Sequence, residues 1–574
     1  MTKISKLLII LILLTISISA TSIDSNTSDN NTSNNDVINT QLKKTFKTSP
    51  SILLKNIAQK KLLKKLYRNN NYKTLWFQNN KLNQEKFTKL FEYIKNDITL
   101  DQKGLIYKNY HNLEKELDDN LTEIHSLRLE LKLTSLYHNF LEHLIYGEIQ
   151  WKHFSRKLTS LKKRRINAAW IKVKPKFNIT NLIYQNDIDT TILEVTPKNF
   201  GYGQLLLALE KLQKLKENGG WEKLPSFKKL ALGDSGDIVL KLRNRLKISG
   251  DYQECNETNE SVLITQDDNI SRDINLSRDA VFGHCLDNAV KIFQKRHGLV
   301  IDGIVGGGTQ RALNTSIDEK IHKIRLNIDR IKWLPREDYE RYLVVNIPQF
   351  MLHYIENDEV KKELRVIVGD KKHPTPIFSE KISYIVLNPY WKVPEGIVKR
   401  EIIPAMVKNP NYLRQQGLEA HRTWDENSRL IDTSWLYWED YLYGQKFPYR
   451  LMQPPGPKNA LGKIKFKFPN KFSVYLHDTP TKHLFKRRVR AFSHGCVRLS
   501  QPRSLLETIA TFNPKINIKK AKKVLKGKRK KFLSVDNKLR IYLVYLTAGM
   551  NDKGQIEFRN DIYNYDKYQK RRLR

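Results

Sequence analysis

The sequence predicts a multidomain α+β protein in which helical segments precede a mainly β region. Three observations carry this prediction. Between about residues 50 and 225, apolar residues recur every three or four positions, as on one face of a helix. Three short helical patterns separated by glycine-marked turns follow at 226–316. From Arg341 onward, short runs rich in β-branched and aromatic residues alternate with polar turns.

Length and composition limit the classes of protein to consider. The 574 residues have room for three to four domains, and the 40% hydrophobic content is ample for their cores. The formal net charge of +41 favours polyanionic partners. The sequence nevertheless has no zinc-finger spacing, basic-zipper heptad or RNA-binding aromatic strand, so nucleic acid is not expected as a partner. It also shows no cluster of metal ligands, and neither a metal nor another cofactor is predicted. The oligomeric state stays open.

The first residues have the order of a secretory signal. Lys3 and Lys6 precede an apolar run from Leu7 to Ile18 that ends in small residues, so residues 1–20 are predicted to be a signal peptide. The run is short for a membrane span, and an uncleaved N-terminal anchor is the alternative. Residues 21–49 are mostly Ser, Asn, Thr and Asp and are expected to form a disordered linker.

Residues 50–225 are predicted to form a helical scaffold domain without a catalytic constellation. The clearest helix carries one apolar stripe, formed by Leu129, Leu133, Leu136, Phe140 and Leu144. Such a stripe faces a core, so it indicates structure and not a binding site.

The next segment is a compact three-helix unit. A Gly-Asp turn at 233–237 opens the first helix, "AVKIFQKRHGL" at 289–299 forms the second, and an Asp-Gly turn at 302–303 leads to a third at 309–313. This order resembles the peptidoglycan-binding domain of bacterial wall enzymes, which implies such a domain at 226–316. A polar insertion at 251–278 departs from the plain pattern, and a helical connector is expected at 317–340.

Two of the three cysteines are predicted to pair. Cys255 lies in the insertion and Cys285 just after it, and in an exported protein they can form a disulfide that closes a loop of about 30 residues. Loop entropy gives such a bond on the order of 3 kcal/mol of stability. Cys496 would then be the free thiol.

The β region contains one long interruption. Residues 341–394 show strand patterns of a β-meander, whereas about 395–449 is helical and aromatic. An excursion of this size between strands is expected to be a lid over a cleft. Strand patterns resume before His477, which therefore lies at a strand end.

The candidate catalytic residues are Cys496 and its neighbours in the sequence. A thiol of ordinary pKa, about 8.5, is only a few per cent thiolate at neutral pH, so a catalytic cysteine needs a base or a positive charge nearby. His477, the adjacent His494 and Arg498 are the candidates. On this local context alone, a buried structural cysteine is an equal alternative.

The two segments around these residues identify a family. "YLHDTP" at 475–480 followed by "SHGCVR" at 493–498 resembles the L,D-transpeptidase catalytic domain of YkuD type. "QPPGPKNALGKIKF" at 453–466 and "DIYNYD" at 561–566 are similar to the large periplasmic subclass of Gram-negative bacteria. The resemblance implies a catalytic domain at 341–566 with a lid at about 395–449, followed by a basic tail at 567–574. It also implies a periplasmic location, with the membrane reached only through the signal or an N-terminal anchor.

The resemblance also assigns roles. Cys496 would attack the diaminopimelate carbonyl of a tetrapeptide donor stem, and His477 would be the base, oriented by the main-chain carbonyl of Asp478. The N–H groups of Cys496 and Gly495 would stabilise the oxyanion. The amine of a second diaminopimelate would resolve the thioester and give a 3→3 cross-link. The residues expected to bind substrate or line the cleft are Ser493, His494, Arg498, Tyr475 and Trp391. The alternative for Arg498 is to hold the loop, and for Tyr475 and Trp391 it is core packing. His494 stays a lesser candidate for the base.

Several alternatives stay open. Water or another amine can resolve the same acyl-enzyme, which gives a carboxypeptidase, a cross-link hydrolase or an enzyme that anchors proteins. A non-catalytic wall-binding protein would be expected to lack Cys496 or His477. A papain-like peptidase places its cysteine before its histidine, unlike this chain. The resemblance makes the protein a carbapenem target. The basic run at 519–531 and the tail are expected to be solvated surface, or to hold the protein to anionic envelope polymers.

Overall fold

The computed structural model describes residues 36–47, 59–78, 81–116, 122–173, 175–185, 187–255, 278–337, 339–551 and 553–572. The expected signal peptide, most of the expected linker and most of the polar insertion lie outside these residues. No helix within them has the length and hydropathy that a membrane span requires. The chain divides into two compact units, one of residues 1–88 and 116–135 and the other of 89–115 and 136–574.

The smaller unit corrects one expectation about the linker. It contains α2 (Asp36–Lys47), α3 (Lys60–Asn69), the hairpin of β1 (Phe77–Gln78) and β2 (Lys81–Leu82), and the first part of α6 (Glu123–Tyr146). Residues 36–47 were expected to be disordered, but Ile38, Leu42 and Phe46 lie four residues apart and are buried on one face of α2. The ring of Phe46 stacks on Tyr67 of α3, with centroids 5.9 Å apart. These three apolar residues give α2 a buried face, although the rest of the segment is mostly polar.

The rest of the scaffold region is helical, as predicted. Its helices are α4 (Gln84–Asn96), α5 (Leu105–Lys115), α7 (Trp151–Lys163), α8 (Ile179–Gln185), α9 (Ile188–Val195) and α10 (Tyr202–Glu217). The five residues of the apolar stripe in α6 are all buried.

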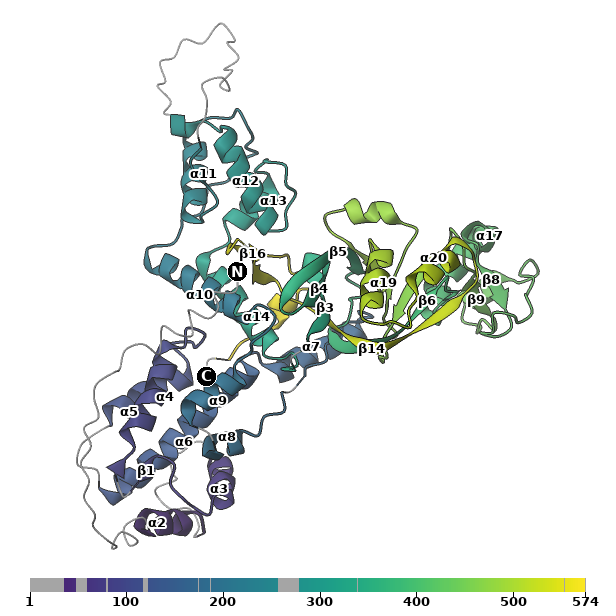
Figure 1. Ribbon diagram of the computed structural model, residues 1–574. Helices are drawn as coiled ribbons and strands as arrows, with labels where there is room; N and C mark the ends of the chain where they lie inside the picture. The colour runs from purple at the N-terminus through teal and green to yellow at the C-terminus, as the bar shows by residue number, and fades with distance from the viewer. Residues whose placement is uncertain are drawn as a thin grey trace, which may run out of the picture. The chain divides into compact units, whose positions relative to one another are not determined.

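The three-helix unit follows within the larger unit. Figure 1 shows its helices gathered into one bundle: α11 (Asp237–Ile248), α12 (His284–Arg296) and α13 (Gly307–Leu313). Their core includes Leu242, Phe293 and Leu313, which are fully buried. The predicted disulfide between Cys255 and Cys285 is confirmed, with Cα atoms 5.8 Å apart. The connector forms α14 (Ile317–Ile331), which begins with a capping box between Ser316 and Glu319.

The mainly β region is a sheet of nine strands in the order β12-β5-β13-β11-β10-β6-β14-β3-β4. Because β4 pairs with β5 as well as with β3, the sheet closes on itself around an apolar core. The strands are β3 (Arg341–Asn346), β4 (Met351–Glu356), β5 (Glu359–Gly369), β6 (Phe378–Leu387), β10 (Ile464–Lys467), β11 (Leu476–His477), β12 (Ala491–Ser493), β13 (Val497–Leu499) and β14 (Lys531–Val544). Only β3, β4 and β5 form the expected meander, because β6 pairs with β10 and β14.

The lid contains strands as well as the expected helices. Its helical elements are α15 (Glu395–Ile397), a π-helical turn (Val398–Ile402), α16 (Ile403–Lys408), α17 (Tyr412–Gln416) and α18 (Trp438–Leu442). A small sheet in the order β7-β9-β8 joins them, formed by β7 (Trp391–Lys392), β8 (Glu419–His421) and β9 (Arg450–Gln453). These strands have two to four residues, too few for an alternating pattern to predict them. The lid has an apolar core of its own.

The C-terminal part begins with α19 (Pro502–Thr511) and α20 (Ile518–Lys526) and ends with β15 (Ala548–Met550), β16 (Ile556–Phe558) and α21 (Tyr565–Tyr568). The hairpin β15–β16 packs against α10 and α14.

The expectation of a solvated basic tail is wrong at Arg571. Its guanidinium forms a buried ion pair with Asp329 of α14 at 2.8 Å, and its charge acts together with that of Lys332 on this carboxylate.

Candidate active site

Parallel pairing of β11 with β13 brings the two predicted motifs together. His477 lies opposite Arg498, and the Val497 N–H donates to the Tyr475 carbonyl at 3.1 Å, which extends the pairing to Cys496. Successive side chains alternate between the two faces of a strand. One face is fully buried in the core and carries Leu476, Val497 and Leu499. The other face therefore carries Tyr475, His477, Cys496 and Arg498.

His477 is held as a neutral base. Its ring is buried, and Nδ1 lies 2.5 Å from the main-chain oxygen of Asp478. A carbonyl only accepts hydrogen bonds, so Nδ1 carries the proton and Nε2 keeps a free lone pair. Burial, followed by the charge of Arg498, lowers the pKa of His477 to about 3, although the Asp478 carbonyl acts in the opposite direction. The predicted orientation by this carbonyl is confirmed.

The carboxylate of Asp478 has a separate, structural task. It accepts hydrogen bonds from the main-chain N–H groups of Lys463 and Thr479, at 2.9 and 2.8 Å, and pairs with Lys482 at 2.5 Å. These contacts stabilise the turn that contains the main-chain carbonyl of Asp478. The histidine is oriented by a main-chain group, and no carboxylate among the described residues forms a hydrogen bond with it.

Cys496 rests as a thiol. The residue is half-buried, and burial raises the pKa of its thiol, whereas hydrogen bonds from Tyr475 and the charge of Lys465 act to lower it. Its Sγ lies 3.8 Å from the carbonyl oxygen of Ser473, which accepts a weak hydrogen bond from the thiol. A protonated thiol beside a neutral imidazole needs general-base assistance to become a nucleophile.

The loop before the cysteine is held by its own polar groups. The Ser493 hydroxyl donates to the Cys496 carbonyl at 2.5 Å and accepts from the Gly495 N–H at 3.2 Å. Gly495 adopts φ +108°, a conformation that residues with a side chain rarely reach. Two expectations change as a result. The Gly495 N–H is occupied inside the loop and not free for an oxyanion, and buried Ser493 supports the loop and does not face a substrate.

The main-chain N–H of Cys496 is the remaining oxyanion donor. Within the described parts of the chain, no hydrogen bond engages it. It lies next to the reacting sulfur, where an oxyanion formed by thiol attack would develop.

His494 is tied to the lid. Its Nε2 lies 2.6 Å from the Glu401 carboxylate, and its ring packs beside His373 with centroids 4.7 Å apart. The hydrogen bond with His494 lowers the pKa of Glu401, which keeps this carboxylate charged. Because Nε2 is engaged with Glu401, the geometry favours His477 over His494 as the base. The contact also joins the lid to the loop that carries Cys496.

The remaining predicted residues differ in their surroundings. Arg498 donates to the Thr481 hydroxyl at 3.3 Å, while its buried Nε has no partner among the described residues. Tyr475 is half-buried, and burial raises its pKa well above the ordinary value; the charge of ionised Cys496 and the hydrogen bond with it act in the same direction. Trp391 is half-buried in β7 and packs against the apolar core of the lid, so its established contacts are structural.

Sequence analysis missed Lys465. Its Nζ lies 3.8 Å from the centroid of the Tyr475 ring, and β10 pairs it with His477. Burial, followed by the charge of Lys467, lowers the pKa of Lys465 to about 8, whereas Cys496 in its ionised form acts to raise it. The alternation in "KIKF" was the available signal, because it places Lys465 on the face opposite the buried Phe466.

A second residue that the sequence did not reveal, Thr375, supports the loop that carries Cys496. Thr375 is fully buried; its hydroxyl donates to the Gly495 carbonyl at 2.9 Å and accepts from the Gly369 N–H at 2.8 Å. The Tyr563 hydroxyl donates to the Gly369 carbonyl at 2.6 Å and accepts from the Thr375 N–H at 3.2 Å. The "DIYNYD" segment thus supports the cysteine loop. No local pattern links residues so distant in sequence.

This arrangement defines a class of enzyme site. A free cysteine lies on one face of a closed sheet, in the strand next to a buried neutral histidine, with an unoccupied main-chain N–H at the sulfur. These groups suit acyl transfer through a cysteine. Within the described residues, no group of three or more His, Cys, Asp or Glu is placed to hold a metal ion.

Comparison with known families agrees with this class. Residues 340–523 match the L,D-transpeptidase catalytic domain (YkuD), 61–209 a scaffold domain, and 235–313 a "Putative peptidoglycan binding domain". The chain therefore contains a YkuD-type L,D-transpeptidase catalytic domain together with a peptidoglycan-binding domain. The fold class predicted from the sequence is confirmed.

Individual relatives are similar over part of the chain. A "Putative L,D-transpeptidase" of Haemophilus influenzae is 33% identical over 245 residues, which cover 43% of this chain and 48% of that protein. The match thus spans about half the length of the relative.

Solved structures give weaker matches. The L,D-transpeptidase of Stackebrandtia nassauensis is 14% identical with a TM-score of 0.20, over 56% of this chain and 96% of that one. The L,D-transpeptidase fragment from Xylanimonas cellulosilytica is 15% identical with a TM-score of 0.16, over 56% and 99%. TM-scores of this size carry no structural argument.

Proposed function

We propose that the protein is an L,D-transpeptidase that forms 3→3 cross-links between diaminopimelate residues through a thioester on Cys496. The observation that carries this proposal is that a protonated thiol and a buried imidazole, whose free nitrogen is Nε2, lie on the same face of two neighbouring strands. The family match supports transpeptidase chemistry, and the matched peptidoglycan-binding domain supports a wall substrate.

The first half-reaction forms the thioester. His477 Nε2 takes the thiol proton as the sulfur attacks the diaminopimelate carbonyl of a tetrapeptide donor. The Cys496 N–H stabilises the oxyanion of the tetrahedral intermediate. The intermediate collapses as the bond to the terminal D-Ala breaks, and the imidazolium returns the proton to the leaving amine. Free D-Ala and an acyl-enzyme remain.

The second half-reaction transfers the acyl group. The side-chain amine of a second diaminopimelate attacks the thioester and gives up a proton to His477, and the sulfur leaves and regains a proton from the imidazolium. One amide bond forms and the thiol is restored. Arg498, whose Nε has no partner among the described residues, would hold a carboxylate of a peptide stem next to the reacting carbonyl.

We also infer that the protein works in the periplasm. The disulfide between Cys255 and Cys285 supports this location, because such bonds persist in oxidising compartments and are rare in reducing ones. The signal-like first residues lie outside the described part of the chain. Peptide sequencing of the mature protein from a periplasmic extract tests the location, and recovery only from the cytoplasm would refute it.

The decisive experiment separates the possible acceptors. Purified protein and the Cys496→Ala variant are incubated with a tetrapeptide muropeptide, and the products are analysed by mass spectrometry. A dimer formed only by the intact protein supports cross-linking. Tripeptide alone means that water resolves the acyl-enzyme, and an unchanged substrate with both proteins refutes the proposal. A carbapenem adduct on Cys496 is expected in the intact protein alone.

A further inference from the structure

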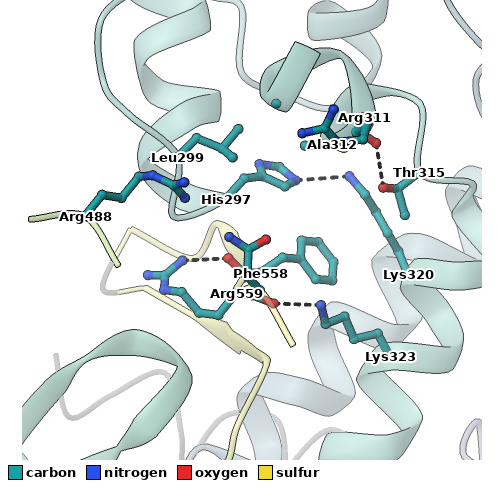
Figure 2. A pocket seen from close by; sticks show the side chains of 12 residues that line it. His297, Leu299, Arg311, Ala312, Thr315, Lys320, Lys323, Arg488, Phe558 and Arg559 are labelled. Carbon is teal, nitrogen blue, oxygen red and sulfur yellow. Dashed lines mark hydrogen bonds between the residues drawn. The ribbon is translucent and has the colours of Figure 1, made fainter. Parts of the chain in front are cut away.

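A cavity of about 250 Å³ lies between the three-helix unit and the C-terminal hairpin (Figure 2). Its walls come from the end of α12, from α13 and α14, from the residues around β16, and from the segment before β12. None of the residues of the cysteine loop and none of the residues around His477 line it. The cavity is therefore separate from the site of Cys496.

The cavity has a strongly positive lining. Five cationic side chains face it and none of its described lining residues carries a carboxylate; the cations are Arg311, Lys320, Lys323, Arg488 and Arg559. Two of these charges are balanced elsewhere. Lys323 lies 3.5 Å from Asp566, and Arg559 pairs with Glu557 at 2.6 Å. Lys320, Arg311 and Arg488 have no carboxylate partner within the described residues.

Lys320 is the most unusual of the three. The residue is only 4% exposed. Its Nζ lies 3.2 Å from the Nε2 of His297 and close to three aromatic rings. The rings are those of Trp221, Phe558 and Phe293, with centroids at 5.0, 5.1 and 5.7 Å. A buried ammonium group without a counter-ion is costly, so burial favours the neutral amine, and an anion bound in the cavity would favour the protonated, charged form of Lys320.

His297 cannot supply that anion. Its Nδ1 lies 2.8 Å from the Phe293 carbonyl and must donate to it, so Nε2 accepts from Lys320. Burial, followed by the charges of Arg296 and Arg245, lowers the pKa of Lys320 well below its ordinary value, and Asp251 acts against this shift. Figure 2 shows Lys320 directed at His297 on one side of the cavity, with Arg311 above them.

The other two cations reach the cavity from different elements. Arg311 is exposed on α13, and no hydrogen bond or ion pair engages its guanidinium within the described residues. Arg488 lies between the two catalytic motifs in sequence, and its guanidinium donates only a long hydrogen bond, 3.4 Å, to the Gly298 carbonyl. Guanidinium groups bind carboxylates with two parallel hydrogen bonds.

The remaining lining favours a peptide over a bare ion. Leu299, Ala312 and Phe558 give the cavity an apolar wall, and its volume suits one or two small residues. We propose that this cavity binds the carboxylate terminus of a short peptide, with Lys320, Arg311 and Arg488 as its positive partners. The proposal depends on the proposed function only for the source of the peptide, which would be a cell-wall stem.

The test uses the full chain with Cys496→Ala, so that no turnover occurs. Isothermal titration with N-acetyl-D-alanyl-D-alanine should show binding that is at least tenfold weaker for the C-terminal amide of the same peptide. Lys320→Met and Arg311→Gln should each weaken binding about tenfold or more, as loss of a charged hydrogen bond does. Met suits the apolar surroundings of position 320, and thermal unfolding verifies that both variants are folded.

Two controls locate the binding. Lys295→Gln removes the same charge from α12 outside the cavity and should leave affinity unchanged. Lys241→Gln on α11, which is also outside the cavity, should likewise leave it unchanged. Equal affinity of the Lys320→Met, Arg311→Gln and parent proteins would overturn the proposal, as would binding of inorganic phosphate in place of the peptide.

The proposed function and this site can fail separately. A protein that cross-links muropeptides but binds no peptide acid at the cavity refutes the site alone. A protein that binds the peptide acid with the expected variant pattern but forms no cross-link refutes only the proposed function.

Discussion

The resting state of Cys496 makes a sharp prediction about pH. Cys496 is the free cysteine of the chain, because Cys255 and Cys285 are joined, so iodoacetamide should label one site. An ordinary thiol is roughly 3% ionised at pH 7, and burial raises the pKa of Cys496 above the ordinary value. Below its pKa, the thiolate fraction falls about tenfold per pH unit. The alkylation rate should therefore fall about 100-fold from pH 8 to pH 6.

The shape of the profile matters more than the absolute rate. A cysteine in an ion pair with an imidazolium is already fully ionised in this range, so its thiolate fraction does not change with pH. Its profile would be flat between pH 6 and pH 8. Because the pKa of His477 is about 3, the imidazole adds no step in this range. A flat profile would refute the neutral thiol–imidazole pair.

The same experiment tests the electrostatic role of Lys465. The charge of Lys465 acts to lower the pKa of Cys496, so Lys465→Met should move the rising limb of the alkylation profile to higher pH. Lys471→Met is a matched control, since that exposed residue is not among the groups that shift the thiol. Identical profiles for both variants would show that Lys465 does not act on the sulfur.

Three further predictions concern the support of the site. Thr375→Val nearly preserves the shape of the side chain but leaves two buried main-chain groups unpaired. The free energy of unfolding, measured in urea, should therefore fall by about 2–4 kcal/mol, whereas Thr375→Ser should stay close to the parent. Equal stability of the two variants would contradict this prediction. Joint replacement of Cys255 and Cys285 by Ser should lower the free energy of unfolding by on the order of 3 kcal/mol and leave alkylation of Cys496 unchanged. An unaltered denaturation midpoint would count against this prediction. Glu401→Gln should slow acylation by a muropeptide less than about tenfold, whereas His477→Gln should slow it more than about 100-fold. A larger loss with Glu401→Gln than with His477→Gln would indicate that His494 is the base.

The sequence predicted features that have a local cause. The stripe in α6 repeats at helical spacing, and each of its residues is buried. The position of His477 at a strand end followed from the alternating residues before it. Its orientation by the Asp478 carbonyl came from family resemblance, and the fold realises it because the two residues are adjacent in the chain.

The missed features depend on contacts between distant segments. The Thr375 hydroxyl reaches Gly495 only because β5 and β13 are neighbours in the closed sheet, a pairing that no local pattern determines. Similarly, nothing before folding shows that the Ser493 hydroxyl turns back to the Gly495 N–H and so removes an expected oxyanion donor. Competition between hydrogen-bond partners is decided by tertiary geometry.

The C-terminal segment shows how these distant contacts serve one purpose. Tyr563 holds Gly369, and through Thr375 it fixes the carbonyl of the cysteine loop. Three residues later, Asp566 forms a buried ion pair with Arg330 of α14 at 2.7 Å. Removal of Asp566 would leave the buried charge of Arg330 without its carboxylate partner, which is strongly destabilising. The segment is thus anchored to α14 at one end, through Asp566, and to the cysteine loop at the other, through Tyr563 and Thr375.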